Sequence, residues 1–277
     1  ATTYLKRNDT SNSGVNIREN GNNVVASASG IEIAFNKKNG KLVSVKNQKG
    51  NISLNGGPVP VGLESEITGT NWSEDDEGNF VLEIISKGYP EKITWKLQKN
   101  GLLYLEASPL KGGRNIDFAG ISFNYPEQKC KAVKWMGRGP YRVWKNRLKG
   151  SNMGVWEKAY NNTVTGESFN NLIYPEFKGY HGNLYWATLE STESDFTVIS
   201  ETPNLYFRLF TPAKPQYVAG GTYPRFPEGD ISFLYEIPAI GTKFKQADQL
   251  GPKSRKGTYG GHNDDEFYPI KLWFDFR

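Results

Sequence analysis

Short runs of alternating apolar and polar residues, separated by turn residues, recur along almost the whole sequence. Ile31, Ile33 and Phe35 alternate with polar residues, and a second apolar run follows Asn39-Gly40, a pair that tolerates the positive φ angles of a hairpin turn. No stretch keeps apolar residues at helical spacing for three turns. The pattern predicts an all-β fold of large antiparallel sheets packed face to face. The further strand candidates are 79–87, 92–98, 102–107, 117–124, 183–190, 195–200, 204–210, 230–237 and 270–276.

The composition is sufficient for a sizeable core, because 37% of the residues are hydrophobic and 13% are aromatic. No apolar run approaches the roughly 20 residues of a membrane-spanning helix, so we expect no membrane span. Residues 1–29 are polar, and we interpret them as a linker or the edge of the chain. No break in composition divides residues 30–277, which we expect to form one domain.

Several classes of site are excluded by what the sequence lacks. A single cysteine, Cys130, and two histidines, His181 and His262, leave no disulfide framework and no cysteine- or histidine-rich metal centre. There is no glycine-rich phosphate loop after a strand. We therefore expect no cofactor and no metal. The net charge of +5 is mild for 277 residues and requires no nucleic-acid partner.

A loop before the last strand candidate combines small, polar and aromatic residues. Its glycines at 260 and 261 allow sharp bends, and its side chains could hydrogen-bond sugar hydroxyls or stack on a ring face. It could equally be an ordinary loop at the end of a sheet. The candidate sugar-binding residues here are His262, Asp264, Asp265, Phe267 and Tyr268.

A basic and aromatic segment, residues 134–149, supplies a second set of candidates. Interleaved cations and aromatic rings suit an anionic glycan or a single-stranded nucleic acid. The alternative is a solvated sheet edge with core tryptophans. The candidates are Arg138, Arg142, Trp144 and Arg147, with Lys145 as a further cation. We interpret His181 and His262 as turn histidines, and Trp186 as a buried residue of an alternating strand.

Four groups of residues together resemble a known family. Gly137-Arg138-Gly139-Pro140, followed by Trp144, Asn146 and Arg147, resembles a motif of family 2 glycoside hydrolases, G-x-G-P-x-E-x-Y-x-D-R, which lies in the C-terminal small chain domain of their β-galactosidases. Three further stretches are similar to that domain in the same order along the chain. They are residues 35–42, then Tyr174-Pro175 with Gly179, Trp186 and Leu189, and finally Gly260, Asp264, Asp265, Phe267 and Pro269.

The resemblance implies a galactose-mutarotase-like β-supersandwich. It also implies that the catalytic glutamates lie on a (β/α)₈ barrel outside this chain. This chain would then be a non-catalytic accessory domain that binds carbohydrate or shapes the sugar pocket of that barrel. Phe267 stands where the family has a tryptophan that reaches the pocket. Departures from the family motifs are Arg142 in place of Glu, Trp144 in place of Tyr, Asn146 in place of Asp, and Phe177 in place of Glu.

Two other functions remain open from the sequence. The first is a free-standing carbohydrate-binding module that recognises an anionic polysaccharide through Arg138, Arg142, Lys145 and Arg147. The second is an aldose-1-epimerase-type enzyme, which the implied fold would permit. A role in polysaccharide processing would suit the periplasm or the cell exterior.

Overall fold

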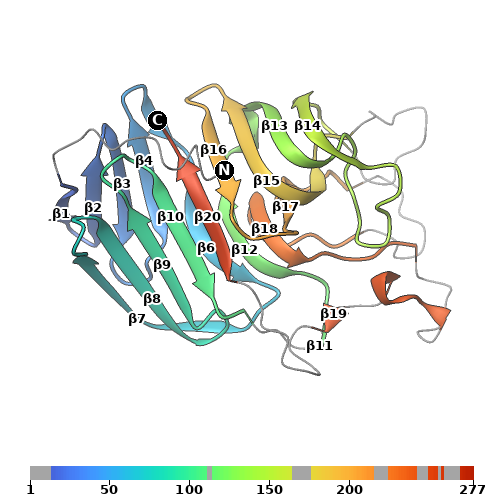
Figure 1. Cartoon of the computed structure of the whole chain (residues 1–277), viewed down its shortest axis with the longest axis horizontal. Helices are drawn as coiled ribbons and strands as arrows, with labels where there is room; N and C mark the ends of the chain where they lie inside the picture. The colour runs from blue at the N-terminus through green and yellow to red at the C-terminus, as the bar shows by residue number, and fades with distance from the viewer. Residues whose placement is uncertain are drawn as a thin grey trace.

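The regular secondary structure of the described residues is almost entirely antiparallel β-strand, which confirms the all-β prediction (Figure 1). All nine further strand candidates coincide with observed strands. Within the described residues, no helix is long and apolar enough to cross a membrane. The computed structural model describes residues 14–110, 114–163, 176–214, 224–241, 249–254, 257–258 and 269–277.

A five-stranded sheet is formed by the N-terminal part of the chain. Its first two strands lie in the region that composition alone predicted to be a linker. Some of its few apolar residues, such as Val24 and Ala26, are fully buried, and the polar residues around them obscure the pattern in the sequence. The strands are β1 (Asn16–Asn20), β2 (Asn23–Ala28), β3 (Ile31–Asn36), β4 (Leu42–Asn47) and β5 (Gly50–Ile52).

A 13-stranded sheet contains most of the remaining strands. Its main path runs in the order β6-β12-β18-β17-β15-β16-β20-β10-β9-β8-β7, with β13 paired to β15 and β14 paired to β13. The strands are β6 (Asn55–Val61), β7 (Ser65–Glu74), β8 (Phe80–Gly88), β9 (Lys92–Leu97), β10 (Leu103–Ser108), β12 (Ala119–Asn124), β13 (Cys130–Gly139), β14 (Asn152–Ala159), β15 (Gly179–Ser191), β16 (Phe196–Ser200), β17 (Tyr206–Leu209), β18 (Ile231–Glu236) and β20 (Ile270–Asp275).

Strand β15 joins the two halves of this sheet. Its first residues, Gly179–His181, pair with β17, whereas Trp186–Leu189 pair with β16. Between them Asn183 has a positive φ of 49°, and the pairing with β13 shifts register. The irregularity lets one long strand belong to both halves. The smaller elements are a pair of short strands, β11 (Arg114–Ile116) and β19 (Gly257–Thr258), and two 3₁₀ helices, η1 (Glu127–Lys129) and η4 (Pro252–Ser254).

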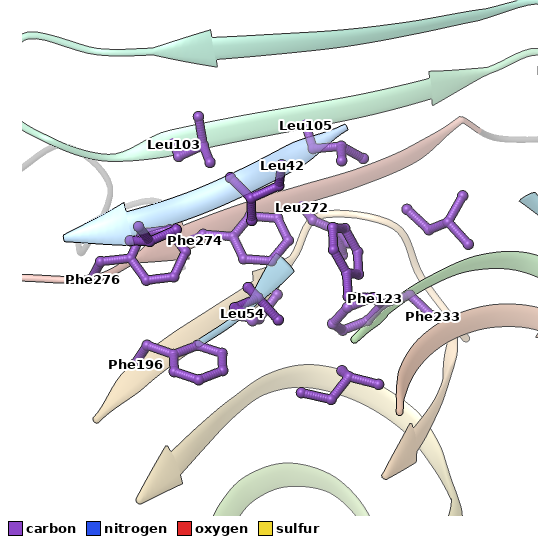
Figure 2. Packing of buried hydrophobic residues seen from close by; sticks show 14 of the residues in the cluster. Leu42, Leu54, Leu103, Leu105, Phe123, Phe196, Phe233, Leu272, Phe274 and Phe276 are labelled. Carbon is purple, nitrogen blue, oxygen red and sulfur yellow. The ribbon is translucent and has the colours of Figure 1, made fainter. Parts of the chain in front are cut away.

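The main core lies where the inner faces of these sheets meet. Figure 2 shows Leu103 and Leu105 of β10 close to Leu272 and Phe274 of β20. Trp95 of β9 contacts Phe274 at a ring-centroid separation of 5.8 Å. The odd-numbered residues of β10 are therefore buried, and their even-numbered neighbours face away from this core.

The hairpin predicted at Asn39-Gly40 is present between β3 and β4. Gly40 has a φ of +65°, and a Cβ atom there would lie 2.2 Å from Cγ1 of Ile84. A glycine is thus needed both for the left-handed backbone and for the close packing of the turn against β8.

Candidate functional site

The basic and aromatic segment begins as a regular strand and ends in a tight turn. Its first part is β13, where Trp135 is buried on the inner face and Lys134 lies on the outer face. After the strand, the chain turns at Trp144–Arg147, where the Arg147 N–H donates to the Trp144 carbonyl over 2.8 Å. The segment is therefore an ordered part of the sandwich rather than an extended basic surface.

Trp144 is a core residue of this region. Its side chain is largely buried, and its ring contacts Tyr180 and Phe226 edge-on at centroid separations of 5.4 and 5.8 Å. It belongs to a small hydrophobic cluster next to the main core. Packing is thus the role that the geometry gives to this indole.

Two of the candidate cations are neutralised by carboxylates, one buried and one partly buried. Arg142 forms an ion pair with Glu176, and the two side chains are only 11% and 7% exposed. Lys145 forms an ion pair with Glu236 and is 6% exposed. Burial raises the pKa of both Glu176 and Glu236, and the neighbouring cations oppose this effect. These pairs hold the segment against the sandwich.

The other candidates of the segment have different surroundings. Arg138 donates from Nε to Oδ1 of Asn183 over 2.8 Å and from a terminal nitrogen to the Ser151 carbonyl over 3.2 Å. Arg147 is exposed, and it donates to the carbonyl of Asn146 over 2.9 Å. The cations proposed for an anionic glycan therefore do not form one exposed group, since two of them are buried.

Asn146 forms a clamp that the sequence did not reveal. Its side-chain Nδ2 donates to the Ile240 carbonyl over 2.9 Å, and its Oδ1 accepts from the Ile240 N–H over 3.1 Å. The amide thus pairs with a distant backbone segment as a strand neighbour would. Nothing in the local sequence signals this contact, because the partner lies almost a hundred positions away.

Several buried or partly buried ionisable side chains lie near Arg142, and the sequence did not predict this cluster. Glu176 and His181 each have a buried side-chain atom, Oε1 and Nδ1, without a hydrogen-bond partner among the described residues. Burial lowers the pKa of Lys158 to about 8, and the charge of Glu176 opposes this shift. The charge of Arg142 is matched by the carboxylate of Glu176, one position before Phe177.

His181 is a strand residue, not the turn residue that we expected. It lies on β15 with its ring against Trp135 at 4.8 Å and Phe207 at 6.0 Å. Its Nε2 lies 3.3 Å from the Phe177 carbonyl. Only 1% of the residue is exposed, and burial lowers its pKa to about 4 from the ordinary value of 6.5.

This pKa predicts a loss of stability in acid. Above pH 6.5, the pKa of a histidine in the unfolded chain, His181 is neutral in both states and the fold keeps its full stability. As the pH falls from 6.5 toward 4, the unfolded chain binds a proton at this histidine and the folded chain does not, so the fold loses stability. The loss should be about 3 kcal/mol. Urea unfolding should show that the free energy of unfolding decreases less between pH 7 and pH 4 for His181→Gln than for the unsubstituted chain. Equal decreases would contradict the assignment, because the other titrating groups cancel in this comparison.

The loop candidates lie outside the described residues. These are His262, Asp264, Asp265, Phe267 and Tyr268. The description resumes at Pro269, whose carbonyl accepts hydrogen bonds from Thr202 Oγ1 over 2.7 Å and from the Tyr235 hydroxyl over 3.2 Å. The end of this loop is therefore anchored to β18 and to the segment after β16. Among the described residues, no three or more His, Cys, Asp or Glu side chains are grouped so that they could hold a metal ion.

Comparison with known families identifies the domain. The family model described as beta galactosidase small chain matches residues 27–211, about two thirds of the chain. The matched range includes the hairpin at 35–42, the segment 134–149 and all of β15, and it ends before the loop at 260–269. No curated protein sequence matches the chain significantly. The chain belongs to the beta galactosidase small chain family.

Proposed function

We propose that this chain is a non-catalytic accessory domain of a glycoside hydrolase and lies against the catalytic domain of its parent protein. The observation that carries the proposal is the family match over residues 27–211. The catalytic domain, a (β/α)₈ barrel, would supply the acid and the nucleophile. This domain would contribute contacts that complete the sugar pocket.

The geometry of the segment after β13 supports this role. The ion pairs of Arg142 with Glu176 and of Lys145 with Glu236 tie the segment to two different parts of the sandwich. The clamp between Asn146 and Ile240 adds a third attachment. A loop held at several points presents a fixed surface, which suits a domain that positions another domain's pocket. Phe267, with Tyr268, Asp264, Asp265 and His262 beside it, stays our prediction for the loop that reaches this pocket.

The two alternatives receive less support. An anionic polysaccharide needs exposed cations, whereas the charges of Arg142 and Lys145 are already balanced by the carboxylates of Glu176 and Glu236. An epimerase needs an acid and a base that reach the sugar ring. His181 is enclosed by Trp135 and Phe207, and burial lowers its pKa to about 4, so it is neutral at physiological pH.

The isolated chain should therefore hydrolyse no glycoside and should not accelerate mutarotation. The test uses the purified 277-residue chain. Its substrates are aryl β-galactoside, β-glucoside and β-glucuronide, and the mutarotation of free galactose is followed by polarimetry. We expect rates equal to those of buffer. A rate that copurifies with the chain and disappears in Glu176→Gln or His181→Gln would overturn the non-catalytic assignment.

A further inference from the structure

A row of six largely apolar side chains, three of them aromatic, crosses the large sheet from β10 to β14, and Ile199 near its middle is buried. In the strand registers, Tyr104 lies opposite Trp273, and Trp273 lies opposite Ile199. Ile199 lies opposite Trp186, and the row continues through β13 to β14. We call this row the outer stripe; it consists of Tyr104, Trp273, Ile199, Trp186, Met136 and Val155.

The outer stripe faces away from the main core. Leu103, Leu105 and Leu272 are fully buried and point into that core (Figure 2). Successive side chains of a strand point to opposite faces, so Tyr104 and Trp273 lie on the other side of the sheet. The same alternation directs Trp186 outward, since its neighbour Ala187 is fully buried. Trp186 is only partly buried, which differs from the buried position that we expected.

The aromatic rings at one end of the outer stripe are held in place. Tyr104 and Trp273 contact each other with a centroid separation of 4.8 Å. The Tyr104 hydroxyl donates to Glu106 over 2.7 Å, and Trp273 Nε1 donates to Glu201 over 2.9 Å. The two rings are therefore fixed before any ligand arrives, and carboxylates lie at their edges.

Polar side chains border most of the outer stripe, although exposed Met153 lies beside Val155 at its β14 end. On one side, Thr188 and Thr197 share a hydrogen bond of 2.8 Å across β15 and β16, and Lys134 on β13 is opposite Thr188. On the other side, Glu106 is opposite Lys271 on β20. Both signs of charge border the stripe. This arrangement favours a neutral ligand with many hydroxyl groups over an anionic one.

The dimensions of the outer stripe argue against a protein partner. Apart from its β14 end, where Met153 lies beside Val155, it is one side chain wide, whereas a stable protein interface buries about 800 Å² on each partner. From β10 to β15 it spans three strand spacings of about 4.8 Å, or about 14 Å. A β-linked neutral glycan has this form, since it is a narrow ribbon with apolar C–H faces and hydroxyl groups along its edges. Its faces would lie on the rings, and its hydroxyl groups would meet the bordering polar rows.

We propose that the outer stripe binds a neutral, β-linked polysaccharide chain. This binding goes beyond the proposed accessory role, because it requires no catalytic partner and belongs to this chain alone. Native gels cast with soluble β-glucan, β-mannan or β-galactan test it directly, with polygalacturonate as the charged comparison. We expect at least one neutral polymer to retard the 277-residue chain, and polygalacturonate to have no larger effect.

Substitutions within the outer stripe locate the binding. Trp186→Ala and Trp273→Ala should each weaken retardation about tenfold or more, as is usual for a central aromatic contact, and Trp186→Phe should restore most of it. Ile85→Ala is the matched control, because Ile85 is exposed on β8 outside the stripe and should not affect binding. Thermal melting must show that each variant remains folded.

Either of two results would overturn the proposal. One is the absence of retardation by every neutral polymer. The other is retardation that persists unchanged in both tryptophan variants while they remain folded. Sedimentation tests whether the chain associates with itself through the outer stripe. If Trp186→Ala changes this self-association but not the retardation by glycans, the stripe is a protein contact and the glycan proposal fails.

Discussion

Replacing Trp95 with alanine should lower the free energy of unfolding by about 3–5 kcal/mol. Trp95 is fully buried, and its ring contacts Phe35 at 5.4 Å and Phe274 at 5.8 Å. These partners come from the five-stranded sheet and from β20 of the large sheet. The indole therefore fills the space where the two sheets meet, and truncation leaves a cavity that rigid strands cannot close.

Urea unfolding followed by circular dichroism measures this loss. Trp95→Phe is the control, since it keeps a ring but loses the 3.2 Å hydrogen bond from Nε1 to the Gly40 carbonyl. It should cost about 1–3 kcal/mol, less than the alanine variant. An alanine variant that unfolds at the same urea concentration as the unsubstituted chain would show that the sheets do not pack around this residue.

Replacing Arg208 with methionine should destabilise the fold by a similar amount, about 3–5 kcal/mol. Arg208 is fully buried on β17, and burial lowers its pKa to about 10, so it remains charged at neutral pH. Its guanidinium donates to Ser232 Oγ over 3.1 Å and to the three consecutive carbonyls of residues 227–229 over 2.6–3.1 Å. Methionine fills much of the same space but leaves these acceptors without a donor.

The matched control is Arg208→Lys, which keeps the positive charge but lacks the planar set of donors. Its stability should lie between those of the methionine variant and the unsubstituted chain. Thermal and urea unfolding of all three proteins give the order. If the methionine variant is as stable as the unsubstituted chain, the guanidinium is not what holds residues 227–229 to the sheet.

The strands that could be predicted from the sequence are those whose local pattern is complete. The hairpin at Asn39-Gly40 follows from turn chemistry, and its glycine has the positive φ that such turns use. Strand β13 was missed because its outer face carries Lys134 and Arg138, which made a half-buried strand look like a basic surface. Alternation is still present there, with Val133 and Trp135 fully or almost fully buried.

The candidate site could be predicted only in part, because its contacts join distant parts of the chain. Nothing near Lys145 in the sequence indicates that it meets Glu236, 91 positions away. Trp186 illustrates a second limit. Alternation shows that two faces of a strand differ, but when both carry apolar residues it does not show which face is inside. The register across five other strands is needed to place Trp186 on the outer stripe.

Glycoside turnover by the full product of the encoding gene tests the accessory role most directly. The measurement compares that product with a version from which residues 27–277 have been deleted, using the same aryl glycosides. Our account predicts that the full product contains a catalytic barrel and hydrolyses a glycoside, and that the deletion removes most of this turnover while the barrel remains folded. Equal turnover with and without residues 27–277, or a gene product and associated subunits that contain no barrel, would contradict it.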